Sequence, residues 1–182
     1  MNRFEVSEAD GKNALHYLGG VTVSDSPLKA AASLQILDVL LAHGMDINAV
    51  HKIMDGCDIF PATPLWYAYT RGRNRPLYTQ LLTLDADPQN CMFAIAWYND
   101  VAAAQLFKIH GANIEAPAGG STPFMAAYLW RRFEIAEWFL KNGADVNTVD
   151  AKGNTAMYYA LKRKYKKEPR QLLLDYGATH KS

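Results

Sequence analysis

Apolar positions recur along the chain in blocks, and each block closes on a similar short segment. The clearest closing segment is Gly143–Asn147, which comes shortly after the apolar run Trp138–Leu140. Related segments, each after its own apolar run, are Gly44–Asn48, Gly111–Glu115 and Gly177–Thr179. Because glycine adopts the left-handed conformation that ends a helix without a Cβ clash, each segment predicts a helix end. A helix end that recurs at a roughly fixed spacing is typical of repeat proteins.

A second recurring element predicts where helices begin. Thr63-Pro64 and Thr122-Pro123 each precede a run of apolar and small residues. Threonine caps the free N–H groups of a helix start, and proline fits the first helical position. Weaker versions of this element begin at Asn13, Cys91 and Thr155. A second helix is expected in each unit, and prolines mark several of these starts, at Pro27, Pro76 and Pro169.

Two local features refine the helix predictions. The segment Arg131–Leu140 has a helical period, and the residues predicted to face inward are Phe133, Ile135, Ala136, Phe139 and Leu140. In Leu84–Pro88, by contrast, Asp85 stands where the other closing segments have glycine. Because aspartate tolerates the left-handed conformation less well than glycine, we expect a less regular helix end there.

These residues resemble the consensus of ankyrin repeats. Asp150–Met157 is similar to the D-x-x-G-x-T-P-L start of such a repeat, and Gly120–Asn147 resembles one repeat nearly from end to end. Thr122 and Thr155 are 33 positions apart, which is the ankyrin period. The resemblance implies an all-α ankyrin-repeat solenoid of helix-turn-helix units with short β-turn fingers between them. It implies a single domain over residues 1–182, with about five repeats at approximately 8–48, 54–87, 88–115, 117–147 and 150–180.

The first three of these repeats depart from the consensus. Thr63 and Cys91 are only 28 positions apart, so the third repeat is expected to lose most of its finger. Asn13 and Thr63 are 50 positions apart, so extra chain is expected around Gly19–Asp25 and Ala49–Ala62. Long connecting segments often carry function, which makes these two segments candidates for a specific role.

The resemblance also implies a binding face. In ankyrin arrays the fingers and the exposed side of the first helices line a concave surface, to which each repeat contributes a few residues. The variable pairs that follow the small residues of each first helix would be Thr70-Arg71, Tyr98-Asn99, Leu129-Trp130 and Lys162-Arg163. Trp97 lies beside these pairs, and the fingers would add Ile59, Phe60, Ala118, Ala151 and Lys152.

Three of these residues have the side chains that most often dominate protein interfaces, namely Arg71, Tyr98 and Trp130. The alternative for the two tryptophans is that Trp97 and Trp130 fill gaps between irregular repeats, because aromatic side chains are often partly buried. The sequence leaves both interpretations open.

The last repeat carries a cluster of basic residues: Lys162, Arg163, Lys164, Lys166, Lys167 and Arg170. One interpretation is a solvated cap, since a terminal repeat needs a polar outer face. The other is attraction of an acidic protein or of nucleic acid. Because the formal net charge is only +1 and no nucleic-acid motif is present, an acidic protein is the better functional candidate.

The composition fits a folded protein without membrane segments. The chain has 182 residues, 49% of them hydrophobic, which is enough for a substantial core. We expect no secretory signal, because the N-terminus lacks a long apolar stretch, and no apolar run is long enough to span a bilayer. A cytoplasmic protein is expected. The two cysteines, Cys57 and Cys91, lack a Cys-x-x-Cys neighbour and are expected to be reduced and buried.

Candidate catalytic chemistry is sparse. The histidines are scattered, at His16, His43, His51, His110 and His180. His43 and His110 precede closing glycines, where they can interact with the last helix carbonyls. His16 matches the histidine of the T-P-L-H motif, which implies a structural hydrogen bond. No metal-ligand spacing or phosphate-binding loop is found, so we expect no metal, no cofactor and no enzymatic activity.

These observations favour a non-catalytic protein-binding module that acts through its concave face. A finer hypothesis, made by analogy, is a small cytoplasmic inhibitor or immunity-like protein that neutralises a toxin or enzyme and is a monomer when free. The alternative is a regulatory adaptor for nucleic-acid processes that uses the basic C-terminal repeat. An enzyme with a site in Ala49–Ala62 is a third hypothesis, which no residue pattern supports.

Overall fold

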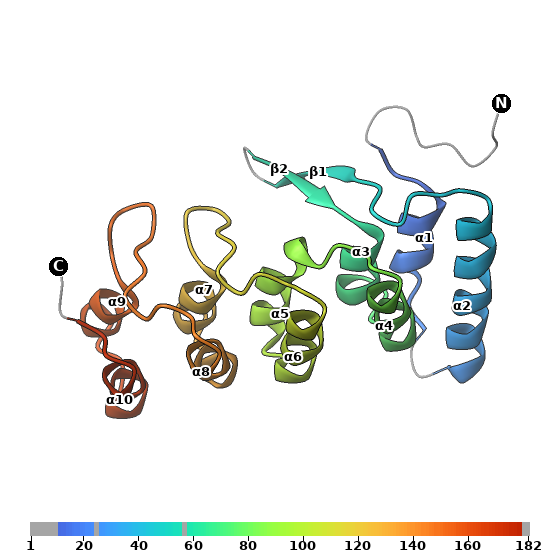
Figure 1. Cartoon of the computed structure of the whole chain (residues 1–182). Coiled ribbons are helices and arrows are strands. Elements are labelled where there is room, and N and C mark those ends of the chain that lie inside the picture. Colours follow the sequence, from blue (N-terminus) through green and yellow to red (C-terminus); the bar gives the residue numbers. More distant parts are fainter. Residues whose placement is uncertain (1–10, 24–25, 56–57, 180–182) are drawn as a thin grey trace. The chain divides into compact units, whose positions relative to one another are not determined.

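Helices that follow one another in pairs make up most of the computed structural model, which describes residues 11–23, 26–55 and 58–179 (Figure 1). Cys57 and His180 lie outside the described residues. The chain divides into two compact units, Met1–Cys91 (unit 1) and Met92–Ser182 (unit 2). The single domain and the five repeat boundaries stay predictions.

Unit 1 contains two helix pairs and a β-hairpin. Its elements are α1 (Ala14–Gly20), α2 (Pro27–Ala42), β1 (His51–Asp55), β2 (Asp58–Ala62), α3 (Pro64–Thr70), α4 (Arg75–Thr83) and the 3-10 turn η1 (Gln89–Cys91). Helix α1 packs against α3, and α2 packs against α4. The first helices of the two pairs are therefore neighbours, and so are the second helices.

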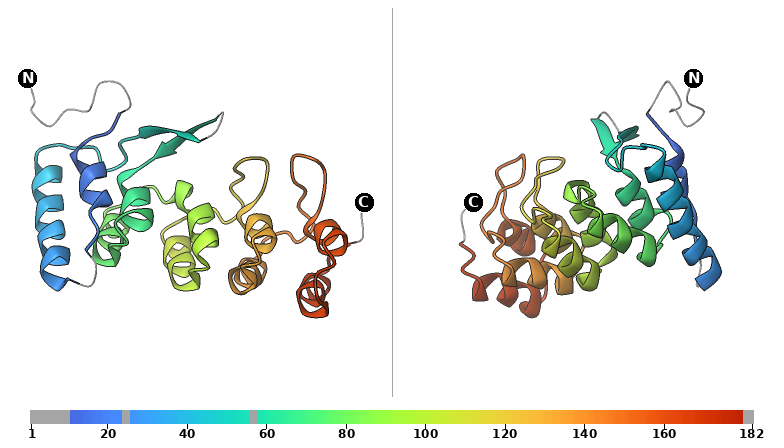
Figure 2. Two further views of the ribbon diagram at one scale, coloured as in Figure 1. Left: turned by 180° about the vertical axis from the view of Figure 1, so that it is seen from behind. Right: turned by 45° about the vertical axis from the view of Figure 1, so that its right-hand side comes forward.

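Unit 2 repeats this arrangement with three helix pairs (Figures 1 and 2). Its helices are α5 (Met92–Tyr98), α6 (Val101–Ile109), α7 (Pro123–Leu129), α8 (Phe133–Lys141), α9 (Ala156–Lys162) and α10 (Lys167–Asp175). Helix α7 contacts both α5 and α9, while α6 contacts α8. The predicted helix-turn-helix units are thus present in both units.

The helix starts form as the sequence predicts. The side chains of Asn13, Thr63, Thr122 and Thr155 each accept a hydrogen bond from the backbone N–H three residues on. These bonds satisfy N–H groups that a helix start leaves without intrahelical partners. Ser26 and Asn74 cap the second helices α2 and α4 in the same way.

The helix ends also follow one pattern. Gly143 has a φ of 97°, and the N–H groups of Gly143 and Ala144 donate to carbonyls of the last turn of α8. The expectation of a less regular end at Asp85 is wrong. Asp85 adopts a φ of 60°, and the N–H groups of Asp85 and Ala86 donate to Leu82 and Leu81 in the same pattern. Aspartate reaches this part of the left-handed region, so the missing glycine does not change the geometry.

The long segment Ala49–Ala62 forms an antiparallel hairpin that the all-α prediction did not include. Strands β1 and β2 pair in a register that sets His51 opposite Ala62 and Ile53 opposite Phe60. The other fingers are much shorter, with single bridges between Ala118 and Ser121 and between Val149 and Thr155. Among the described residues, the segment between α4 and η1 has no such bridge. This agrees with the short spacing of the third repeat.

The core of unit 2 is aromatic and aliphatic. Ile135, Ala136, Phe139 and Leu140 of α8 are buried as predicted, whereas Phe133 is half-buried. The sequence prediction omitted Trp138 from the inward face, yet only 8% of it is exposed. Among the described residues, no helix combines the length and the apolar character needed to cross a bilayer.

Candidate functional site

The candidate site in unit 2 lies at the C-terminal ends of the first helices, α5, α7 and α9. Shortly after each of these helices, one residue has a positive φ. The φ angles are 56° at Asn99, 62° at Arg131 and 51° at Lys164. In unit 1 the equivalent residue is Arg73, with a φ of 49°. In unit 2 these residues mark the same position, because the next N–H group donates five residues back in each repeat; the turn at Arg73 is one residue longer, since the Asn74 N–H donates to Ala68.

The predicted pairs can be placed against this register. The residues that directly precede the positive-φ position are Arg71-Gly72, Trp97-Tyr98, Leu129-Trp130 and Lys162-Arg163. Two predicted pairs coincide with these residues, whereas Thr70-Arg71 and Tyr98-Asn99 are shifted by one residue. Thr70-Arg71 nevertheless follows the cap Thr63 at the same spacing as Leu129-Trp130 follows Thr122, because the turn in unit 1 is longer. The four predicted pairs stay predictions.

Trp97 and Trp130 pack against each other across two repeats. Their ring centroids are 5.0 Å apart with the planes at 84°, an edge-to-face arrangement that aromatic pairs favour. Trp97 is 49% exposed and Trp130 is 38% exposed, so neither ring belongs to the core. The structure combines the two interpretations, because the rings bridge the repeats and still present apolar surface to solvent.

Arg132 completes this aromatic pair. Its guanidinium carbon lies 5.9 Å from the centre of the Trp97 ring, and its Nε donates to the Trp97 carbonyl at 3.0 Å. An arginine held over an aromatic face is oriented before a partner arrives, which lowers the entropy cost of binding. The sequence prediction missed Arg132 because it was assigned to the start of the second helix, although it follows Trp130 by only two residues.

Basic side chains of the last repeat also lie against aromatic rings. Lys162 donates from Nζ to the hydroxyl of Tyr158 at 3.2 Å. The guanidinium of Arg163 lies 5.4 Å from the centre of the Tyr159 ring and donates to the Leu129 carbonyl at 3.4 Å. Lys162 and Arg163 are both exposed. We call the set formed by Trp97, Tyr98, Trp130, Arg132, Lys162 and Arg163 the aromatic–basic surface.

Asn99 makes two side-chain hydrogen bonds to the start of α8. Its Oδ1 accepts the backbone N–H of Ile135 at 3.1 Å, and its Nδ2 donates to Glu134 Oε2 at 3.0 Å. The residue before α8, Arg132, makes no side-chain capping bond. Asn99 thus caps α8 from the preceding repeat, and both polar atoms of its side chain are occupied inside the protein.

The finger residue Lys152 is exposed at the turn between α8 and α9, where its N–H donates to Asp150 Oδ1 at 2.9 Å. Asp150 also accepts the Tyr159 hydroxyl at 2.6 Å. Burial opposes ionisation of Asp150, but hydrogen bonds from Tyr159 and from the N–H groups of Asn154 and Lys152 outweigh it and lower its pKa. The finger is therefore held in shape by a charged carboxylate.

Four predicted site residues belong to unit 1. Ile59 is 59% exposed on β2, while the Phe60 ring lies 5.2 Å from that of Trp66, measured between centroids. The guanidinium of Arg71 lies over the same Trp66 ring at 5.8 Å. Thr70 is only 9% exposed and donates its hydroxyl to the Trp66 carbonyl at 2.7 Å, so it offers little surface to a partner.

Two of the histidines, His16 and His43, contact backbone carbonyls. His16 is fully buried, its Nδ1 accepts the Asn13 N–H at 3.2 Å, and its Nε2 lies 3.2 Å from the Ala62 carbonyl at the base of the hairpin. Burial lowers the pKa of His16. His43 lies 2.7 Å from the Val39 carbonyl, at a helix end as predicted.

The Cys91 thiol lies in the core. Burial raises the pKa of the free Cys91 thiol far above its ordinary value, which leaves it protonated and unreactive. Within the described ranges, no three His, Cys, Asp or Glu side chains are close enough together to hold a metal ion.

The family model for ankyrin repeats (3 copies) matches residues 91–182. That segment spans half of the chain and begins at Cys91, the last residue of η1. It contains all of unit 2 and the whole aromatic–basic surface. No curated protein matches this sequence.

Proposed function

Because the chain belongs to the ankyrin repeat family, we propose that it binds a partner protein through the aromatic–basic surface of unit 2 and does no chemistry on it. Ankyrin repeats are protein–protein interaction modules and are generally non-catalytic. The observation that carries this proposal is the exposed Trp97–Trp130 pair with Arg132 held beside it. Paired tryptophans and an arginine are the residue types that contribute most to interface energies.

The chemistry of the surface favours an acidic partner. Three basic side chains lie over aromatic rings: Arg132 over Trp97, Lys162 over Tyr158 and Arg163 over Tyr159. A carboxylate of the partner can contact the basic side chain while an apolar side chain of the partner covers the aromatic ring. Long-range attraction between the charges would raise the association rate and make it sensitive to salt.

The finer form of the proposal is an inhibitory role. A protein that occupies a partner's surface without chemistry can neutralise a toxin or an enzyme, in the manner of an immunity protein. We propose that the chain is a cytoplasmic monomer when free. Light scattering after size exclusion would test the monomer, and protection of cells from the captured partner's activity would test inhibition. A captured partner whose activity is unchanged by the bound chain would contradict the inhibitory role.

The test of the binding surface uses the captured partner and single substitutions. Trp97→Ala and Trp130→Ala are each expected to weaken binding by about 2 kcal/mol, or about 30-fold, if the rings are interface anchors. Ile109→Ala is the matched control, because Ile109 is a large side chain of unit 2 that is 70% exposed outside the surface. Equal affinities for all three variants would show that the partner binds elsewhere.

A second candidate function rests on the exposed basic residues of the last repeat. Lys162, Arg163, Lys164, Lys166 and Lys167 are all exposed. An adaptor for nucleic-acid processes could use them to contact phosphates, with an affinity that falls steeply as salt rises. An electrophoretic shift with duplex and single-stranded probes at physiological salt separates this candidate from the first, and the absence of a shift removes it.

A further inference from the structure

A groove with an acidic rim lies between α8 and α10 of unit 2, lined by the second helices of the last two repeats. Its volume is about 640 Å³, and it is open to solvent along its length. It does not include Trp97, Trp130 or the exposed pair Lys162-Arg163. The groove is therefore separate from the aromatic–basic surface.

The floor of the groove is apolar and firmly supported. Phe133, Pro169 and Leu172 contribute it. The Phe133 ring packs edge-on against Tyr128 at 5.4 Å, measured between centroids, and the Pro169 carbonyl accepts the Tyr128 hydroxyl at 2.8 Å. Tyr128 is fully buried, so these contacts hold the floor from the core side. A ligand would meet a surface that is already in place.

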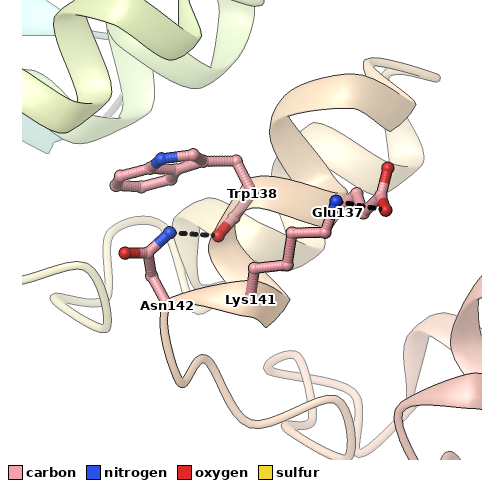
Figure 3. Close-up of polar contacts among 4 residues, drawn as sticks. All are labelled: Glu137, Trp138, Lys141 and Asn142. Atoms are coloured by element: carbon pink, nitrogen blue, oxygen red, sulfur yellow. Dashed lines mark hydrogen bonds and ion pairs between the residues drawn. The ribbon is translucent and has the colours of Figure 1, made fainter.

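Carboxylates dominate the rim. Glu134 and Glu137 line it from α8, Glu168 and Asp175 line it from α10, and Lys167 is the basic residue of the lining. Glu137 is paired with Lys141 at 2.7 Å on the exposed side of α8 (Figure 3). Within the described part of the chain, Glu168 has no hydrogen-bond or ion-pair partner. The lining itself therefore carries four carboxylates and one ammonium group, and Lys141 pairs with one of the carboxylates.

The spacing of these carboxylates follows the two helices. Glu134 and Glu137 are three residues apart on α8, and Glu168 and Asp175 are seven residues apart on α10. At about 1.5 Å per residue, the α10 pair spans about 10 Å along the helix axis. Acidic groups thus flank the apolar floor on both sides, over about two helical turns on α10 and less than one turn on α8.

We propose that the groove docks a cationic amphipathic segment of a partner protein. A large apolar side chain of that segment covers Phe133 and Leu172, and lysine or arginine side chains on either side reach the carboxylates. An apolar face flanked by basic residues is the complement of an apolar floor flanked by acidic ones. The same carboxylates disfavour an anionic lipid or a nucleic acid as the occupant of the groove itself.

The proposal is tested on the full chain with a defined probe. The probe is a fluorescein-labelled helical peptide of about 14 residues, about 21 Å long, with leucines on one face and lysines beside them. Fluorescence anisotropy is expected to show saturable binding. A second peptide, with alanine replacing each leucine, is expected to bind at least about tenfold more weakly because the apolar floor is left uncovered. Equal binding of the two peptides would overturn the proposal, since charge alone would then account for it.

Substitutions locate the site. Glu168→Lys is expected to weaken probe binding at least about tenfold, because it puts a like charge beside the peptide lysines. Asp38→Lys is the matched control, since Asp38 is an exposed carboxylate of α2 in unit 1 and its substitution changes the net charge equally. Equal effects of the two substitutions would overturn the assignment. Asp175→Lys gives the same test at the other end of α10 if far-UV circular dichroism shows that Glu168→Lys does not fold.

Two further outcomes separate this groove from other interpretations. Trp130→Ala is expected to leave probe binding unchanged, because Trp130 does not line the groove. If the probe peptide does not bind, the proposed function of the aromatic–basic surface is therefore unaffected. Sedimentation of the chain alone over a range of concentrations tests a second copy as the occupant. Self-association that Glu168→Lys abolishes would assign the groove to a dimer contact and overturn a separate cationic partner.

Discussion

Asn99 provides the sharpest test of how neighbouring repeats hold each other. Its side chain accepts the N–H of Ile135 and donates to Glu134, so it caps α8 from the repeat before it. Its backbone is also in the left-handed region, with a φ of 56°, where asparagine is tolerated better than most residues. Asn99→Ala removes both hydrogen bonds and keeps a Cβ at this strained position.

The expected loss comes from separate contributions. A side-chain cap at a helix start is worth about 1 kcal/mol, and a partly exposed hydrogen bond to a carboxylate adds about 0.5 kcal/mol. Alanine in the left-handed conformation costs about 0.5 kcal/mol more than asparagine. The free energy of unfolding of Asn99→Ala is therefore expected to fall by about 2 kcal/mol. Asn99→Gly loses the same hydrogen bonds but relieves the backbone, so we expect a loss of about 1 kcal/mol.

The assay is urea unfolding followed by tryptophan fluorescence and far-UV circular dichroism. Three of the four tryptophans, namely Trp97, Trp130 and Trp138, lie in unit 2, so fluorescence reports chiefly on the unit that contains Asn99.

The control is Lys164→Gly, at a φ of 51°. It relieves the backbone without removing a comparable cap and is expected to raise the free energy of unfolding by about 0.5 kcal/mol. A change below about 0.5 kcal/mol for Asn99→Ala would refute the capping role, and equal losses for Asn99→Ala and Asn99→Gly would refute the backbone contribution.

Other predictions follow from single contacts. Gly143→Val should lower the free energy of unfolding by about 2 kcal/mol in a urea titration, because a φ of 97° disfavours a β-branched residue even though an added Cβ there meets nothing within 4 Å. Asp85→Gly should raise it by about 0.5 kcal/mol, and a loss of stability in that variant would contradict the backbone account. Asn147→Ala should cost about 1 kcal/mol and speed hydrogen exchange near Thr179, because Asn147 accepts the Thr179 N–H at 2.8 Å; unchanged exchange would contradict this role. Burial lowers the pKa of His16 in the folded state below its ordinary value of 6.5, so the unfolded chain binds a proton more readily. The contribution of neutral His16 to the free energy of unfolding should therefore be fully present above pH 6.5 and be lost as the pH falls below it. His16→Gln should make the free energy of unfolding less dependent on pH in urea titrations. An equal dependence in the variant would count against His16 as the group responsible.

The helix boundaries could be predicted because they depend on nearby residues. A capping side chain at Thr122 acts three residues away, and the left-handed residue at Gly143 acts within the last turn. The hairpin at Ala49–Ala62 could not be predicted in this way, because its strands pair with each other rather than with a repeated consensus element. The burial of Trp138 was missed for a similar reason, since the packing of neighbouring repeats decides it.

The exposure of single residues in the candidate site could be predicted in part, and their contacts could not. Trp130 and Arg163 have the exposure expected of a surface, but Thr70 is buried and Asn99 is occupied by hydrogen bonds to the next repeat. Arg132 was missed because its orientation depends on the Trp97 carbonyl, 35 residues earlier in the chain.

Hydrogen exchange of the chain with and without its captured partner would show whether the aromatic–basic surface of unit 2 is the binding site. We expect slower exchange on complex formation in the segments that contain Trp97-Tyr98, Leu129–Arg132 and Lys162-Arg163, with little change in α6. Protection that is confined to other segments, with exchange at Trp97 and Trp130 unchanged, would show that the partner binds elsewhere.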